Sequence, residues 1–163
     1  MRQPVRPAML ALALLAAMAP AAYGEVTVRD AWVRGTVPGQ DTTGAYMKLT
    51  STTEAAVTRV SSPSVRAVEI HSMQMQGGVM RMRNELRLPL PAGKPVELGS
   101  SGYHLMLLGV KAALKAGDTV PLQLTITGAD GIETNLQVSA IVRPLNVSGP
   151  TPARQSGNTH QAH

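Results

Sequence analysis

From Val26 onward the chain breaks into short apolar runs separated by turn-forming residues, and this pattern limits the folds open to it. Turn signals such as Pro38-Gly39 and Gly77-Gly78 recur along its length. The run VPLQLTIT at 120–127 alternates apolar and polar residues, as a half-buried antiparallel strand does. No long amphipathic helix is indicated, although the alanine-rich KAALKAG at 111–117 suggests one helical turn. The sequence therefore predicts an all-β, antiparallel sandwich.

We expect nine strands in a single domain that covers residues 25–143. Their ranges are 26–34, 44–50, 56–61, 67–72, 79–84, 96–98, 103–108, 120–127 and 133–142. Phenylalanine is absent, and Trp32, Tyr46 and Tyr103 are the only aromatic residues after position 24, so the core must be mainly aliphatic. Trp32 is expected to pack in that core. With so few aromatic platforms and scattered basic residues, nucleic-acid binding is disfavoured.

The two ends of the chain differ in composition from this domain. Residues 1–24 carry Arg2 and Arg6 before an apolar run and end in small residues, which predicts a secretory signal peptide and export to the periplasm. Because no cysteine follows the apolar run, we expect no lipid anchor, and we expect no membrane span in the mature form. Residues 144–163, rich in Pro, Ser, Gly and Asn, predict a flexible tail. Its His160 and His163 are either weak Cu(II) ligands or merely solvated.

Histidine and methionine gather between His71 and Met106, which suggests a soft-metal site. Ten residues separate His71 from Met82, twenty-one separate Met82 from His104, and one separates His104 from Met106. On strands, where side chains alternate, His104 and Met106 share a face, as do His71 and Met73. Two imidazoles and two thioethers form a neutral set that suits Cu(I) best. A blue-copper electron carrier is excluded because its site needs a Cys thiolate.

At these residues the chain resembles the bacterial periplasmic copper chaperones called PCuA(C). The resemblance rests on the ligand spacing, on YHLM at 103–106 and on DAWVRGTVPGQDTTGAYMKLTS at 30–51, and it spans about residues 26–142. It implies a cupredoxin-like Greek-key fold and Cu(I) ligands at His71, Met82, His104 and Met106. It also implies a Cu(I) metallochaperone that serves the CuA centre of cytochrome c oxidase alongside a Sco-type assembly protein.

Two other functions remain open at this stage. A copper-sequestering or tolerance protein would use the same four ligands without delivery. A metal-free interaction module would use its methionines, including Met73, Met75 and Met80, as core filler. No enzyme is expected, because the sequence lacks GxSxG, HExxH and phosphate-loop motifs. The acids Glu69 and Glu85 are interpreted as surface solvation.

The basic residues Arg81 and Arg83 alternate with Met80 and Met82. If this segment is a strand, the arginines lie on the face opposite the methionines. We expect a solvated face there, and docking of an acidic partner is the alternative.

Overall fold

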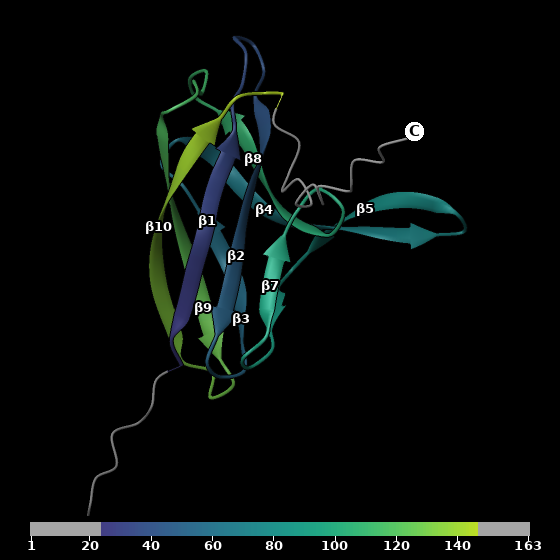
Figure 1. Cartoon of the computed structure of the whole chain (residues 1–163), viewed down its shortest axis with the longest axis vertical. Helices are drawn as coiled ribbons and strands as arrows, with labels where there is room; N and C mark the ends of the chain where they lie inside the picture. Colours follow the sequence, from purple (N-terminus) through teal and green to yellow (C-terminus); the bar gives the residue numbers. More distant parts are fainter. Residues whose placement is uncertain (1–23, 147–163) are drawn as a thin grey trace, which may run out of the picture.

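The computed structural model describes residues 24–146, in which ten strands form one mixed sheet that wraps around a hydrophobic core (Figure 1). The strands are β1 (Val26–Arg34), β2 (Thr42–Ser51), β3 (Ala55–Ser61), β4 (Val65–Gln76), β5 (Val79–Glu85), β6 (Leu88–Leu90), β7 (Pro95–Leu98), β8 (Tyr103–Val110), β9 (Thr119–Gly128) and β10 (Glu133–Arg143). Within the described range no helix has the length and apolar character that a membrane crossing needs. The predicted all-β, cupredoxin-like class is confirmed.

The strands follow the order β5-β4-β8-β2-β1-β10-β9-β3-β6, and β7 pairs separately with β2. Most neighbours are antiparallel, but β1 and β10 run parallel, with Trp32 opposite Ile141. The expectation of a purely antiparallel sheet is therefore wrong at one place. The first and last strands of the described residues meet there, and no short turn between them dictates their relative direction.

The core is aliphatic, as expected from the composition. On β8, Leu105 and Leu107 point inward, and on β9 Leu122 and Leu124 do the same. The alternation predicted for 120–127 is thus present in its first half, since Pro121 is exposed and Gln123 half-buried, but Thr125 is buried as well. Trp32 is buried, but it lies outside the main hydrophobic cluster.

Two local predictions need correction. Strand β6 was not predicted, because a three-residue run that contains Pro89 gives a weak strand signal. It pairs only with β3, at the edge of the sheet, where proline is tolerated. The helical turn predicted at 111–117 does not form. Instead, the backbone of Leu114 is held by Thr36, whose amide donates to the Leu114 carbonyl and whose hydroxyl accepts from the Leu114 amide.

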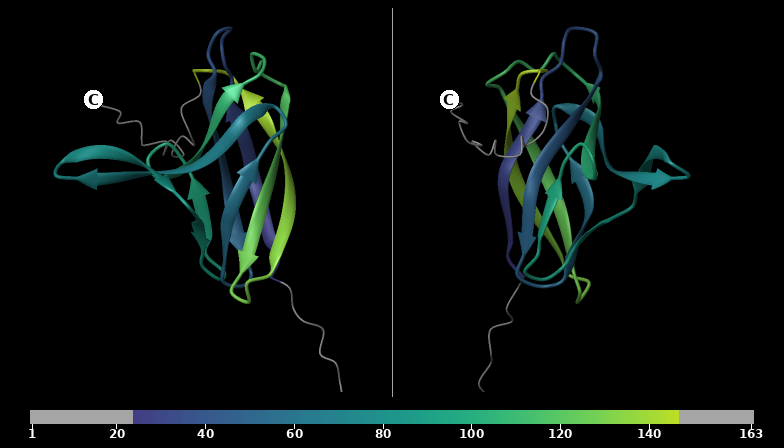
Figure 2. Two further views of the ribbon diagram at one scale, coloured as in Figure 1. Left: turned by 180° about the vertical axis from the view of Figure 1, so that it is seen from behind. Right: turned by 45° about the vertical axis from the view of Figure 1, so that its right-hand side comes forward.

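The β4–β5 hairpin projects from the body of the molecule (Figure 2). Gly77 and Gly78 form its turn with φ values of 59° and 78°, a region that side-chain-bearing residues rarely adopt. Two consecutive positive φ angles match the right-handed twist of the flanking strands. This turn pairs Gln76 with Val79, and so fixes the register of the whole hairpin.

The predicted signal peptide (1–24) and tail (144–163) lie almost wholly outside the described residues, as do His160 and His163. Both segments therefore stay predictions.

Replacing Leu107 by alanine is expected to lower the free energy of unfolding by about 2–5 kcal/mol, because a fully buried side chain is lost and a cavity remains. Leu86→Ala is the matched control, since that leucine is 90% exposed and its loss should change stability by less than about 0.5 kcal/mol. Urea denaturation followed by tryptophan fluorescence measures both variants. Equal losses would contradict the assignment of Leu107 to the core.

Candidate metal centre

The pairing of β4 with β8 brings the two histidines of the described chain together. His71 lies directly opposite His104, and their ring centroids are 5.8 Å apart at an interplanar angle of 70°. An imidazole nitrogen binds a metal ion at about 2 Å, so this separation leaves room for one ion between the rings. Both side chains are largely shielded, since His104 is 5% exposed and the side chain of His71 is 14% exposed.

The methionines join the histidines on the same face of the sheet. Glu69 lies opposite Met106 on β8, two positions from the histidine pair, and Met73 lies opposite Met82 on β5. Met82 and Met106 line one pocket of about 340 Å³ together with His104 and Met73. His71 does not line that pocket but stands beside it through its pairing with His104. Neither Met82 nor Met106 belongs to the hydrophobic core, and Met82 is 51% exposed.

Hydrogen bonds hold one nitrogen of each imidazole and leave the other available. The Nε2 of His71 donates to the Glu69 carboxylate at 2.8 Å, while its Nδ1 is buried without a hydrogen-bond partner. The Nδ1 of His104 donates to the Gly102 carbonyl at 3.2 Å, which leaves Nε2 as the lone-pair nitrogen. A metal ligand needs such a fixed tautomer, and carboxylate or carbonyl partners commonly provide it. The lone pair on the buried Nδ1 of His71 is therefore available to bind a metal ion.

The charge state of His104 also favours metal binding. Burial lowers the pKa of His104 below 6.5, the nearby His71 lowers it further, and the hydrogen bond to Gly102 offsets part of the effect. Desolvation disfavours the charged imidazolium, so the neutral ring that can bind a metal persists below the usual pH of protonation.

The ring of Tyr46 forms part of one wall of the pocket. Gly44 on β2 lies opposite Met106, and the ring of Tyr46 lies across this glycine, with its hydroxyl 2.5 Å from where a Cβ would stand. Trp32 stacks on Tyr46 at 4.4 Å but does not line the pocket. The guanidinium of Arg34 sits over the other side of Tyr46 at 5.7 Å and does reach the pocket. Trp32 therefore supports the wall and does not cover the ligands.

Sequence reasoning missed Glu69, which was interpreted as surface solvation. Its position two residues before His71, on the same strand face, was the available signal. The interpretation of Met75 and Met80 as core filler is also wrong, since they are 66% and 44% exposed. Met47, by contrast, is a buried core residue.

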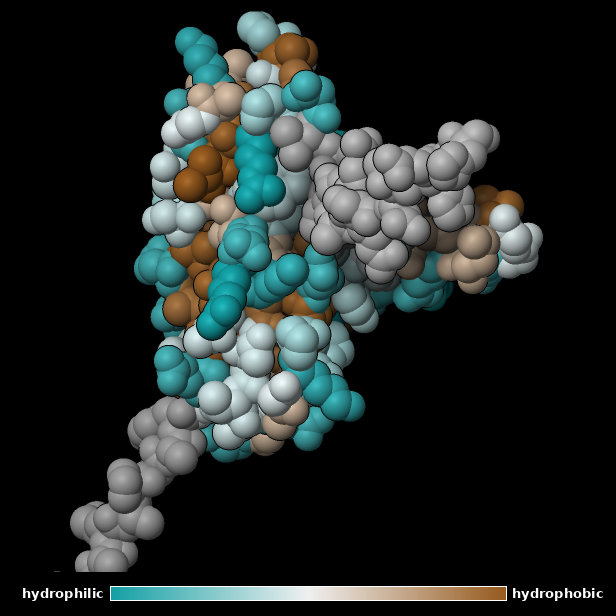
Figure 3. Space-filling view, viewed as in Figure 1, coloured by the Kyte–Doolittle hydropathy of each residue, from teal (hydrophilic) through white to brown (hydrophobic). Residues whose placement is uncertain are grey.

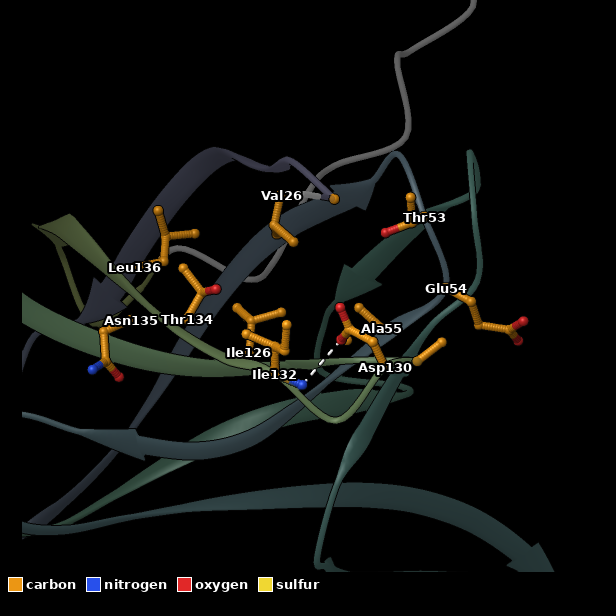
Figure 4. Close-up of a pocket in the computed structure, with 13 residues that line it drawn as sticks. Val26, Thr53, Glu54, Ala55, Ile126, Asp130, Ile132, Thr134, Asn135 and Leu136 are labelled. Atoms are coloured by element: carbon orange, nitrogen blue, oxygen red, sulfur yellow. Dashed lines mark hydrogen bonds between the residues drawn. The ribbon is translucent and has the colours of Figure 1, made fainter. Parts of the chain in front are cut away.

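A second pocket, of about 260 Å³, lies around the β9–β10 turn, where the chain enters β1 (Figure 4). Its lining includes Ile126 and Ile132 and the carboxylates of Glu54 and Asp130, but no histidine or methionine. Asp130 is occupied in accepting a hydrogen bond from the Ile132 amide at 3.0 Å. This second pocket therefore offers no soft donor, unlike the pocket beside His104.

Comparison with known sequences finds one family model and one relative, both described as lipoproteins. The family model described as "Putative lipoprotein LpqE-like" matches residues 26–138. A relative from Leifsonia xyli subsp. xyli (strain CTCB07), "Putative lipoprotein Lxx21020", is 29% identical over 107 residues, which cover 65% of this chain and 63% of that protein. The chain thus spans less than two thirds of that relative's length. The present sequence itself contains no cysteine.

Solved structures share the fold. The apo PmoF2 PCuAC domain has a TM-score of 0.61 at 18% identity, covering 76% of this chain and 93% of that domain. Apo-DR1885 from Deinococcus radiodurans is 31% identical with a TM-score of 0.55, over 92% of this chain and 97% of that protein. The CuI form of DR1885 is 29% identical with a TM-score of 0.53, over 83% of this chain and 85% of that protein.

The lowered pKa of His104 predicts that the metal-free protein loses stability as pH falls. The unfolded chain protonates this histidine near pH 6.5, whereas the folded chain does so only at lower pH. The unfolded state therefore binds more protons below pH 6.5, and the contribution to the free energy of unfolding falls until the folded pKa is reached. NMR titration of the ring protons measures the pKa directly. A value at or above 6.5 would contradict this account.

Proposed function

This chain belongs to the LpqE-like family and has the PCuAC fold, and from that premise we propose that it is an exported copper chaperone carrying Cu(I) to another protein. The proposed ligands are His71, Met82, His104 and Met106. The observation that carries the proposal is the β4–β8 register, which sets His71 opposite His104 on the face that also presents both methionines.

The chemistry of this donor set favours Cu(I). Two imidazoles and two thioethers are neutral and soft, so they match a monovalent soft ion better than a hard divalent one. Thioethers need no deprotonation, and they avoid the oxidation-prone thiolate that a cysteine would bring to an exported protein. Glu69 is proposed as the residue that orients His71, since it holds the opposite ring nitrogen.

The uneven exposure of the proposed ligands suits release as well as binding. His104 is buried, whereas Met82 is about half exposed on the projecting hairpin. A ligand from a partner would reach the ion on the Met82 side, and exchange would proceed while the histidines still hold it. The leader-like residues 1–24 and the lipoprotein names of the relatives support export, and we place the protein in the periplasm. No catalytic step is part of this proposal.

The proposed recipient is the CuA centre of cytochrome c oxidase, reached together with a Sco-type assembly protein. This part rests on the resemblance to PCuA(C) chaperones alone. His160 and His163 remain candidates for weak Cu(II) binding, as imidazoles that suit that ion.

The proposed site predicts one tight equivalent of Cu(I) that depends on the two methionines. Met82→Leu or Met106→Leu should weaken binding at least about tenfold, because each removes a thioether while keeping an apolar side chain of similar size. Anaerobic titration against a chromophoric Cu(I) chelator measures the affinity.

Met47→Leu is the matched control for this titration, since Met47 is 2% exposed in the core and should leave the affinity unchanged. Glu69→Gln should weaken binding by roughly 10–100-fold, as loss of an orienting partner does. Undiminished affinity in both the Met82 and Met106 variants would refute the assigned site.

A chaperone and a sequestering protein differ in what they do with the loaded ion. We expect the Cu(I)-loaded chain to metallate an apo CuA domain of cytochrome c oxidase faster than free chelated Cu(I) does at the same concentration. Separating the two proteins at timed intervals and measuring the copper in each follows this transfer. Retention of the ion by the chain, despite a thermodynamically favourable acceptor, would favour sequestration instead.

A further inference from the structure

Two methionines at the outer end of the β4–β5 hairpin take no part in the proposed four-ligand site. Met75 on β4 lies directly opposite Met80 on β5, and both are largely exposed. The exposed tip of the hairpin carries apolar side chains (Figure 3). Burial in a core cannot explain them, because neither residue belongs to the hydrophobic cluster.

The hairpin turn is what pairs these thioethers. Because Gly77 and Gly78 form a two-residue turn, the register places Met75 opposite Met80 and, one step inward on the same face, Met73 opposite Met82. The Cβ atoms of directly opposed residues lie about 4.5–5.5 Å apart, within which two flexible methionine side chains can bring both sulfurs to one ion.

The same face continues inward to the histidines. From the tip the cross-strand pairs are Met75 with Met80, Met73 with Met82, and His71 with His104. Successive pairs on one face are separated by two residues, or about 7 Å. Exposure falls along β4 from Met75 at 66% to the side chain of His71 at 14%, and His104 is 5% exposed, whereas on β5 Met82 (51%) is slightly more exposed than Met80 (44%). The row therefore leads from solvent to the most shielded ligands.

The opposite face of the hairpin has a different chemistry. Arg81 lies opposite Gln74 and Arg83 opposite Ser72, so the cations point away from the methionine face. Near the base, Ser72 donates a hydrogen bond to Glu85 at 2.6 Å, which ties the two strands together on that side. A metal cation that approaches the methionine face therefore contacts neutral sulfur atoms, while the positively charged arginine side chains lie on the opposite face.

We propose that Met75 and Met80 form a second, outer Cu(I) site, which receives the ion and passes it, with Met73 as an intermediate ligand, to Met82 and the rest of the four-ligand site. The inference rests on the proposed function, because the inner site is the destination. Each transfer exchanges one thioether for the next in the coordination shell of Cu(I). The ion keeps its oxidation state and no proton moves, since thioethers bind in their neutral form.

The test uses residues 25–163, which follow the predicted signal peptide, with the methionine methyl groups labelled with 13C. In anaerobic NMR titration, the first equivalent of Cu(I) should shift the methyl signals of Met82 and Met106. A second equivalent should then shift those of Met75 and Met80. A second equivalent that moves neither hairpin-tip methyl would overturn the outer site.

The double variant Met75→Leu/Met80→Leu tests the relay. It should keep the affinity for the first equivalent, lose the methyl response to the second, and load the inner site severalfold more slowly from a Cu(I)–chelator complex. Loading at the wild-type rate would overturn the relay. If the first equivalent fails to shift Met82 and Met106 in the wild-type chain, the proposed function itself fails, which is a distinguishable result.

Val79→Ala is the matched control at the hairpin tip, since Val79 is 56% exposed and has no sulfur. This variant should load at the wild-type rate. Equal slowing by Val79→Ala would show that the tip acts through apolar contact, and the thioether site would be withdrawn.

Discussion

The register between β4 and β8 is the constraint on which the rest of the structure depends. On one face it sets Ile70 opposite Leu105 in the core, and on the other it sets His71 opposite His104. Because side chains alternate strictly, a slip of one residue would turn the core leucines outward and point the imidazoles into the hydrophobic core. The hydrophobic effect that fixes the core thus also fixes the geometry of the candidate metal centre.

Much of the fold could be predicted because its information is local. Alternation and turn residues predicted nine of the ten strands, with β1 found at its observed limits. The failures have non-local causes. Strand β6 forms because it pairs with β3 at the edge of the sheet. The segment 111–117 forms hydrogen bonds with Thr36 in place of a helical turn. The parallel pairing of β1 with β10 joins the two ends of the domain.

The candidate site likewise has some features that local sequence predicts and others that depend on contacts between distant segments. Strand parity predicted that His104 and Met106 share a face, and that His71 and Met73 do so. Parity could not reveal which strands are neighbours, so the contact of the two imidazoles emerges only from the fold, whereas the same-face spacing of Glu69 and His71 was already present in the sequence. Whether the four residues bind copper stays a prediction of their chemistry and of the family resemblance.

Under the proposed function, the division between an inner half packed on the core and a projecting outer half would let one sheet hold an ion and release it. His104 stands on β8, between two hydrogen-bonded neighbours and over the packed core, so its position is set by many contacts. Met82 stands on β5, at the edge of the sheet and paired only with β4, where few contacts resist its movement. A thioether on such a strand can leave the ion without disturbing the core, whereas an imidazole on β8 cannot. Under the proposed function, ligand exchange would therefore begin at the hairpin. The order in which the ligands dissociate from the ion would follow from the order of strands in the sheet.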